Sequence, residues 1–254
     1  MLVSVLASGS KGNSTLIKTD KLNILIDAGM NLKYLKEKLA EVDTKIEDIN
    51  YIFITHTHKD HIGALSSFVK KYNPKVCVGK KMFLDLDCLK EYDDVIILVD
   101  DLDLEDLHIE LIKTSHDSSE SLGYIFRNVK SSLVYITDTG YVNSRYFKNF
   151  KGKSTYFIES NHDIEMLTHG PYPEWLQKRV LSDVGHLSNK FTGIYLSKLI
   201  DENTQDILLL HLSEKNNSEE CALETVTGAL RETGFQTDRI KCAKPNEISE
   251  VYTI

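Results

Sequence analysis

The chain has little of what marks a secreted disulfide scaffold or a membrane protein. Its 254 residues include only four cysteines, which are widely scattered and form no CxxC pair, so we expect reduced thiols that serve packing. No apolar run approaches the length of a membrane span, and the apolar start at residues 1–7 lacks the basic region of a signal peptide. These absences predict a cytoplasmic protein with no membrane partner.

A surplus of positive charge is absent as well. The formal net charge of -8 argues against indiscriminate coating of nucleic acid, because such proteins usually carry excess Lys and Arg. It does not exclude a local groove for phosphate. With 41% hydrophobic residues and no long low-complexity stretch, the chain suits one substantial core, and we expect a single domain over residues 1–254.

What the chain does have is a cluster of metal-ligating side chains in residues 55–61. The cluster follows the apolar, β-branched and aromatic residues 49–54, which predict a buried strand. Burying three imidazoles and a carboxylate in an ordinary core would cost free energy, whereas these groups are suitable ligands for zinc, manganese or iron. We therefore predict a metal site, against the alternative of a polar surface turn rich in histidine. Its ligands are His56, His58, Asp60 and His61.

The spacing of these side chains indicates how they could be shared between two metal ions. Alternate residues leaving a strand point the same way, so His56 and His58 can bind one ion together. Asp60 and His61 open an expected helix whose apolar residues recur at roughly helical period through residue 69. From there the two side chains can face a second ion close to the first.

Three further candidate ligands follow strand-like apolar runs elsewhere in the chain. His116 follows residues 111–115, Asp138 follows residues 133–137, and His211 follows residues 207–210. Each has an ordinary alternative when taken alone: Asp138 as a turn-former or helix cap, the histidines as hydrogen-bonded residues at strand ends. Together with the first cluster they favour a metal site.

Apolar runs and turn signals also predict the remaining elements. Expected strands are residues 2–6, 14–18, 22–26, 95–99, 109–112, 122–126, 133–136, 156–158 and 207–210, with another near Val76. Expected helices are residues 32–39, 83–90, 175–181, 190–199 and 219–233. This pattern favours two β-rich sheets with helices outside.

The spacing His-x-His-x-Asp-His at residues 56–61 is the signature of the metallo-β-lactamase superfamily. Five loops make the resemblance more specific: SGSKGN at 8–13, FIESNHD at 157–163, GPYP at 170–173, LSDVGHLSN at 181–189 and HLSEKNN at 211–217. The chain resembles the YycJ family, also called WalJ or VicX, over essentially its whole length. The resemblance implies an α/β (α+β) fold, the four-layer αββα sandwich, with metals at one edge between the sheets.

The resemblance also implies how two divalent metal ions, zinc, manganese or iron, are held. One ion would be bound by His56, His58 and His116. The other would be bound by Asp60, His61 and His211, with Asp138 bridging the two. Asp27, in the sequence Ile26-Asp27-Ala28-Gly29, corresponds to the superfamily's first acidic motif and is expected to be a buried residue that supports the ligands.

The activity implied by the resemblance is metal-dependent hydrolysis of phosphodiesters, similar to that of a 5′-to-3′ exonuclease on double-stranded DNA. In that chemistry a metal-activated water attacks phosphorus. Asp60 would orient the water as well as bind metal. His186 is our candidate general acid for the leaving oxygen, with a helix-capping loop as its alternative. Candidate substrate-binding residues are Ser10, Asn13, His162, Ser188 and Asn189.

Three other functions remain open from the sequence. A small-molecule (cyclic) phosphodiesterase or a lactonase would use the same metals in a narrower pocket. A mononuclear iron redox enzyme would use a smaller ligand set, against which the second group of ligands argues. A regulatory binding module would keep its metals for structure alone.

Overall fold

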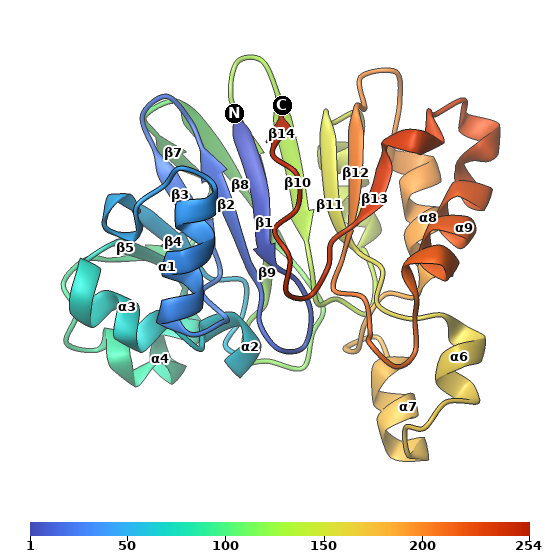
Figure 1. Ribbon diagram of the computed structural model, residues 1–254, viewed down its shortest axis with the longest axis horizontal. Helices are drawn as coiled ribbons and strands as arrows, with labels where there is room; N and C mark the ends of the chain where they lie inside the picture. Colours follow the sequence, from blue (N-terminus) through green and yellow to red (C-terminus); the bar gives the residue numbers. More distant parts are fainter. The chain divides into compact units, whose positions relative to one another are not determined.

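The computed structural model describes residues 1–254, apart from the side chains of Glu232 and Thr237. The chain divides into two compact units (Figure 1). Unit 1 comprises Met1–Leu111, Ser118–Leu122 and Lys244–Ile254, and unit 2 comprises Ile112–Asp117 and Gly123–Ala243. The expectation of a single domain stays a prediction. Among the described residues, no helix combines the length and apolarity needed to cross a membrane.

Unit 1 is built on a seven-stranded mixed sheet of order β14-β1-β2-β3-β4-β5-β6. Its strands are β1 (Leu2–Ala7), β2 (Ser14–Lys18), β3 (Asn23–Ile26), β4 (Tyr51–Phe53), β5 (Lys75–Gly79), β6 (Val95–Leu98) and β14 (Tyr252–Thr253). Neighbours are antiparallel from β14 to β3 and parallel from β3 to β6. The central parallel strands β4 and β5 are almost continuously apolar, as expected for strands covered on both faces.

The helices of unit 1 are α1 (Leu32–Glu41), α2 (Lys59–Ile62), α3 (Leu65–Tyr72) and α4 (Lys80–Asp85). Asn31 begins α1, because its side chain accepts a hydrogen bond from the backbone N–H of Tyr34 at 2.9 Å. Leu35 and Leu39, one turn apart, are the buried residues of this helix. The remaining strands before unit 2 are the antiparallel hairpin of β7 (Leu102–Leu104) and β8 (Leu107–Lys113).

Two expected helices differ from the structure by more than their end residues. The helix expected to run from Asp60 to residue 69 is broken into α2 and α3, because the N–H of Ala64 donates to the carbonyl of Ala28 at 2.8 Å. The helix expected at residues 83–90 begins earlier and ends at Asp85, where a short 3-10 turn takes over.

Unit 2 carries the strands β9 (Leu122–Arg127), β10 (Ser132–Ile136), β11 (Thr155–Glu159), β12 (Asp206–Leu210) and β13 (Ile240–Cys242). β9 and β10 are antiparallel, and β10 to β13 are parallel neighbours. The helices are α5 (Phe147–Phe150), α6 (Ile164–Thr168), α7 (Glu174–Val180), α8 (Asn189–Leu199) and α9 (Glu219–Leu230). Leu196 of α8 and Val226 of α9 pack with Tyr156 and Ile207 of the sheet in one buried core.

The residues that leave the strands take a left-handed backbone conformation at several candidate positions. In unit 1, Asp27 follows β3 with a φ of 61°. In unit 2, Asp138 lies just beyond β10 with a φ of 48°, and His211 follows β12 with a φ of 56°. This conformation is uncommon outside glycine, and Asp, Asn and His tolerate it best. Each turn redirects the chain sharply where a functional side chain is expected.

Candidate metal centre

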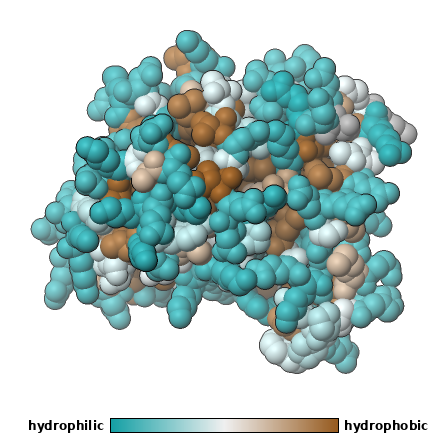
Figure 2. All heavy atoms as spheres, viewed as in Figure 1, coloured by the Kyte–Doolittle hydropathy of each residue, from teal (hydrophilic) through white to brown (hydrophobic). Residues whose placement is uncertain are grey.

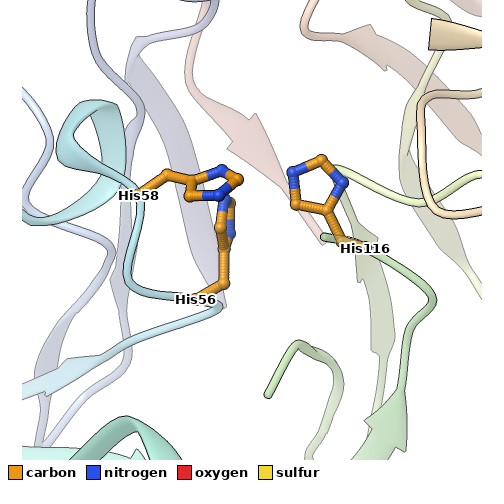
Figure 3. Close-up of side chains that lie close together, drawn as sticks. All are labelled: His56, His58 and His116. Atoms are coloured by element: carbon orange, nitrogen blue, oxygen red, sulfur yellow. The ribbon is translucent and has the colours of Figure 1, made fainter. Parts of the chain in front are cut away.

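Three histidines of unit 1, His56, His58 and His61, lie close together in the loop after β4 and the short helix α2. The rings of His56 and His58 have centroids 4.6 Å apart at 79° (Figure 3), and those of His56 and His61 are 4.0 Å apart. His56 and His61 are fully buried. The side chain of Asp60 comes within 3.6 Å of His61, measured from Oδ2 to Nε2. The loop therefore gathers all four residues of the sequence motif.

A buried carboxylate, that of Asp27, holds this loop in place through contacts with Thr55 and His61. Its Oδ2 lies 2.7 Å from Nδ1 of His61, and its oxygens accept hydrogen bonds of 2.8 Å from the N–H and the hydroxyl of Thr55. A carboxylate at Nδ1 holds the proton there, so that Nε2 of His61 has the lone pair needed to bind a metal. Asp27 is fully buried, in agreement with the prediction that it supports the ligands.

The loop at residues 8–13 supports the same cluster from the other side. The Asn13 side chain accepts a hydrogen bond from the N–H of Gly9 at 2.8 Å, and its amide lies 2.9 Å from Nε2 of His61 and 3.3 Å from Oδ2 of Asp60. Gly29 permits this packing, because a Cβ there would lie 1.6 Å from the carbonyl oxygen of Asp60. Asn13 therefore touches two of the predicted ligands, whereas Ser10 is exposed on the same loop.

Unit 2 has its own cluster of donors at the ends of β10, β11 and β12. Asp138, Glu159, His186 and His211 each offer a ligand atom, and these atoms lie within 4.8 Å of one another. His116, which follows β8 (Figure 3), joins them, because its Nε2 lies 3.8 Å from Oδ1 of Asp138. Its Nδ1 donates to the carbonyl of Gly185 at 3.1 Å. All three predicted ligands of this unit therefore lie in one cluster.

Glu159, the last residue of β11, is the member of this cluster that the sequence did not single out. Its Oε1 lies 2.7 Å from Nδ1 of His186 and 3.1 Å from Nδ1 of His211. Its Oε2 accepts from the backbone N–H of Thr139 at 2.9 Å. The only signal in the sequence was a carboxylate at the end of an otherwise apolar strand. One fully buried carboxylate thus orients the candidate acid and a candidate ligand together.

The electrostatics of the cluster follow from burial and pairing. Burial alone would raise the pKa of Glu159, but the charge of His186 and hydrogen bonds from His186 and His211 outweigh it and lower that pKa to about 2. Burial lowers the pKa of His116 below its ordinary value. Glu159 is therefore an anion, and His116 is held as a neutral imidazole, the form that binds metal.

The remaining predicted residues occupy the loops around α6 and α8. Ser188 caps α8, because its side chain accepts from the N–H of Phe191 at 3.3 Å, as the capping alternative for this loop supposed. Asn189 is fully buried and accepts from the hydroxyl of Ser160 at 2.7 Å. His162 is 1% exposed, and burial lowers its pKa to about 4. Contact of these residues with substrate stays a prediction.

The family model for the metallo-beta-lactamase superfamily matches residues 7–160. The chain is 37% identical over 237 residues to exodeoxyribonuclease YycJ of Bacillus anthracis, which covers 91% of this chain and 90% of that protein. It is 36% identical over 234 residues to exodeoxyribonuclease WalJ of Streptococcus pneumoniae, which covers 89% of this chain and 87% of that protein. The chain belongs to the YycJ/WalJ family of the metallo-β-lactamase superfamily.

Solved structures show the same fold. YhfI of Bacillus subtilis, a metallo-β-lactamase fold protein, matches with a TM-score of 0.72 at 16% identity and covers 98% of this chain and 99% of that one. Igni18, a metallo-hydrolase of Ignicoccus hospitalis, matches with a TM-score of 0.70 at 14% identity, over the full length of both chains. The predicted fold and family resemblance are both confirmed.

Membership in the YycJ/WalJ family implies a hydrolase that binds divalent metal. The donors fit that requirement, because each unit supplies imidazole nitrogens and carboxylate oxygens within a few residues of one another. Several of these donors are buried, and their second nitrogens are held by Asp27, Gly185 or Glu159. Such support is what orients histidines toward a metal.

Proposed function

We propose that this chain is a metal-dependent exonuclease that degrades double-stranded DNA from the 5′ end. The proposal depends above all on one observation, the gathering of Asp138, His211, His186 and Glu159 around one point in unit 2. The names of its relatives YycJ and WalJ, both exodeoxyribonucleases, support DNA as the substrate class. Strand polarity and the preference for duplex come from the family resemblance.

We further propose that the donors of both units serve one dinuclear site. His56, His58 and His116 would hold one divalent ion. Asp60, His61 and His211 would hold the other. Asp138 would bridge them, a role that suits a carboxylate with two oxygens. Zinc, manganese and iron all accept this mixture of nitrogen and oxygen donors.

When bound, two such ions would lower the pKa of the attacking water and stabilise charge on the phosphoryl oxygens. The side chains of this chain supply the rest of the chemistry. The carboxylate of Asp60 accepts a hydrogen bond from that water and aims its oxygen at phosphorus. His186 donates a proton to the leaving 3′ oxygen from Nε2, because Glu159 holds its Nδ1 at 2.7 Å. Glu159 acts through the two histidines as a positioning residue.

A groove of about 460 Å³ in unit 1 supports a phosphate-bearing substrate. Asp60 lines it together with Ser10, Lys11 and Lys59. Lysine ammonium groups bind phosphate as point charges. This local cationic groove explains how a chain with a net charge of -8 can bind DNA at one place without coating it.

Hydrolysis of end-labelled double-stranded DNA by manganese-loaded protein tests the function. We expect stepwise loss from the 5′ end that disappears in Asp138→Ala. The exposed Asp20 provides a matched control, and Asp20→Ala should keep the wild-type rate. Random internal cuts in place of stepwise loss would contradict the exonuclease.

A small chromogenic phosphodiester, assayed in parallel, separates the alternatives. Cleavage of the small diester without cleavage of the DNA would identify a small-molecule phosphodiesterase. Turnover of a lactone with neither diester touched would identify a lactonase. A stoichiometry near one iron per chain would favour the redox enzyme, whereas two divalent ions per chain are expected here.

A further inference from the structure

The only tryptophan of the chain, Trp175, lies on the surface of α7 and is 67% exposed. Exposed apolar side chains surround it in sequence, with Met166 at 37%, Leu181 at 45% and Val184 at 43%. The space-filling view shows pale and light-brown surface among the teal where α6 and α7 lie (Figure 2). Tryptophan is usually well buried, so an indole this exposed is a candidate contact for a binding partner.

Two prolines restrict the backbone of the turn before α7. Pro171 and Pro173, two of the four prolines in the chain, flank Tyr172 and fix the backbone on both sides of it. The side chain of Gln177 on α7 donates to the carbonyl of Tyr172 at 2.8 Å. Tyr172 and Trp175 are therefore two aromatic rings presented on a prearranged piece of backbone, which reduces the entropy lost on binding.

α7 is attached directly to the candidate site of unit 2. Its last residue, Val180, accepts a hydrogen bond from the N–H of His186 at 3.0 Å. Arg179 forms an ion pair with Asp117, the neighbour of His116. Trp175 and Arg179 are four residues apart and so share one face of the helix. The exposed indole therefore lies on the helix face that also carries the link to His116.

A cation from a second loop completes this surface. Lys215 follows His211 by four residues, and its Nζ lies 5.9 Å from the centroid of the Tyr172 ring. The loop is held in place, because the N–H of Asp163 donates to the carbonyl of Asn216 at 2.9 Å. An ammonium group beside one aromatic ring, with a second exposed ring three residues further along the chain, is a combination suited to the phosphate and the base of one nucleotide.

We propose that Trp175, Tyr172 and Lys215 form a stacking platform for an unpaired nucleotide of the DNA substrate. A base stacks on the indole of Trp175 while the adjacent phosphate meets the ammonium of Lys215. Stacking accepts every base, which suits an enzyme that must degrade any sequence. The platform captures the strand after it separates from its complement, next to His186 and His211. This inference rests on the proposed nuclease function.

The single tryptophan makes the platform directly observable, because all indole emission of the protein comes from Trp175. Metal-loaded wild-type protein is titrated with a duplex that has a single-stranded overhang and hydrolysis-resistant phosphorothioate links. We expect saturable quenching of the emission, and weaker quenching by the fully paired duplex. Lys215→Ala should raise the Kd from this titration severalfold. Lys130→Ala, an exposed lysine in the turn between β9 and β10, should leave the Kd unchanged.

Kinetics separate the platform from the chemistry. Trp175→Ala should raise KM for DNA about tenfold, the loss expected for one stacked base, with a smaller change in kcat. Trp175→Phe should recover most of the loss, because a ring remains. Hydrolysis of the small chromogenic phosphodiester should be unchanged in both variants. Val129→Ala, which also removes exposed apolar surface, serves as the control for KM on DNA.

The outcomes distinguish failure of the platform from failure of the function. Indole emission unchanged by DNA, or an unaltered KM in Trp175→Ala, overturns the platform while wild-type exonuclease activity stands. Equal losses on DNA and on the small diester would also overturn it, because they would indicate damage to the site. Absence of DNA hydrolysis by the wild type would instead overturn the proposed function.

Discussion

The carboxylate of Glu159 serves two histidines to which we assigned different tasks. His186 is the candidate acid and His211 a candidate ligand, and both Nδ1 atoms lie within 3.1 Å of the same oxygen. Loss of this oxygen would release both rings at once. A defect at Glu159 should therefore combine weaker metal binding with slower proton transfer.

We expect Glu159→Gln to lower kcat on DNA about 100-fold, the lower range for loss of an oriented general acid. The amide keeps the volume of the side chain, but it has one oxygen and no charge. It therefore cannot accept hydrogen bonds from both histidine rings and the backbone as strongly as the carboxylate does. Steady-state kinetics with metal analysis would measure both effects. Glu165→Gln, on the exposed surface of α6, is the matched control. Wild-type kcat and metal content in Glu159→Gln would contradict the role.

His162 makes a pH-dependent contribution to stability. Burial lowers its pKa from 6.5 to about 4, so the folded protein favours the neutral ring. The contribution is present above pH 6.5 and is lost as the pH falls toward 4, and the free energy of unfolding lost by pH 4 is about 3 kcal/mol.

Denaturant unfolding between pH 7 and pH 4 measures this contribution. We expect the free energy of unfolding to fall less steeply in His162→Leu than in the wild type. His169→Gln, at an exposed histidine on the C-terminal side of α6, should follow the wild-type curve. Parallel curves for His162→Leu and the wild type would show that His162 contributes nothing.

At the scale of single residues, the sequence predicted those candidate ligands that lie close together in the chain at a regular spacing. His56, His58 and His61 were recognisable because strand and helix periods place them on one loop. Glu159 was not recognisable, because its contacts to His186 and His211 join residues 27 and 52 positions apart in the chain. The parallel pairing of β11 with β12 brings Glu159 beside Leu210, the neighbour of His211, and the loop before α8 brings His186 to the same carboxylate.

At the scale of elements, most strand positions were predicted, apart from β7, β13 and β14, and helix ends were predicted less well. The strand expected at residues 14–18 coincides with β2, and that expected at 122–126 falls one residue short of β9. The break between α2 and α3 was not predictable. It depends on the hydrogen bond from the N–H of Ala64 to the carbonyl of Ala28 and on the close approach of Gly63 to the carbonyl of Gly29, from which a Cβ at Gly63 would lie only 2.3 Å away. The spacing of apolar residues along the chain does not indicate those contacts.

This packing makes a prediction for Gly29. A methyl group there would collide with the backbone at Asp60, so Gly29→Ala should displace the α2 turn and lower the free energy of unfolding by at least about 2 kcal/mol. Gly228 on α9 has open space around its Cβ position, so Gly228→Ala should instead stabilise the protein by about 0.5–1 kcal/mol. Thermal and denaturant unfolding would measure both, and equal effects would refute the steric argument.

At the scale of the whole molecule, metal binding should govern stability. The candidate metal donors are spread along the sequence, from His56 to His211. A ligand that binds only the folded state, at about 100 times its Kd, adds about 2.7 kcal/mol. For a protein of this size we expect the Tm to rise by about 5–10 °C on metal loading.

Calorimetry before and after chelation tests this expectation. The Tm should fall when a chelator removes the metal and recover when manganese or zinc is restored. Asp138→Ala should show a smaller shift, while Asp20→Ala should behave as the wild type. A Tm that does not respond to chelation in the wild type would show that metal binding and folding are independent.

The left-handed turns at Asp27, Asp138 and His211 place chemistry and stability in opposition. Glycine would suit each backbone better, yet glycine carries no ligand or support. Glycine substitutions would relieve backbone strain at these positions, but selection for turnover removes them. In a lineage that no longer needs catalysis, substitutions should therefore appear first at these three strand ends. Glycine at these positions would be an early sign that the enzyme has lost its activity.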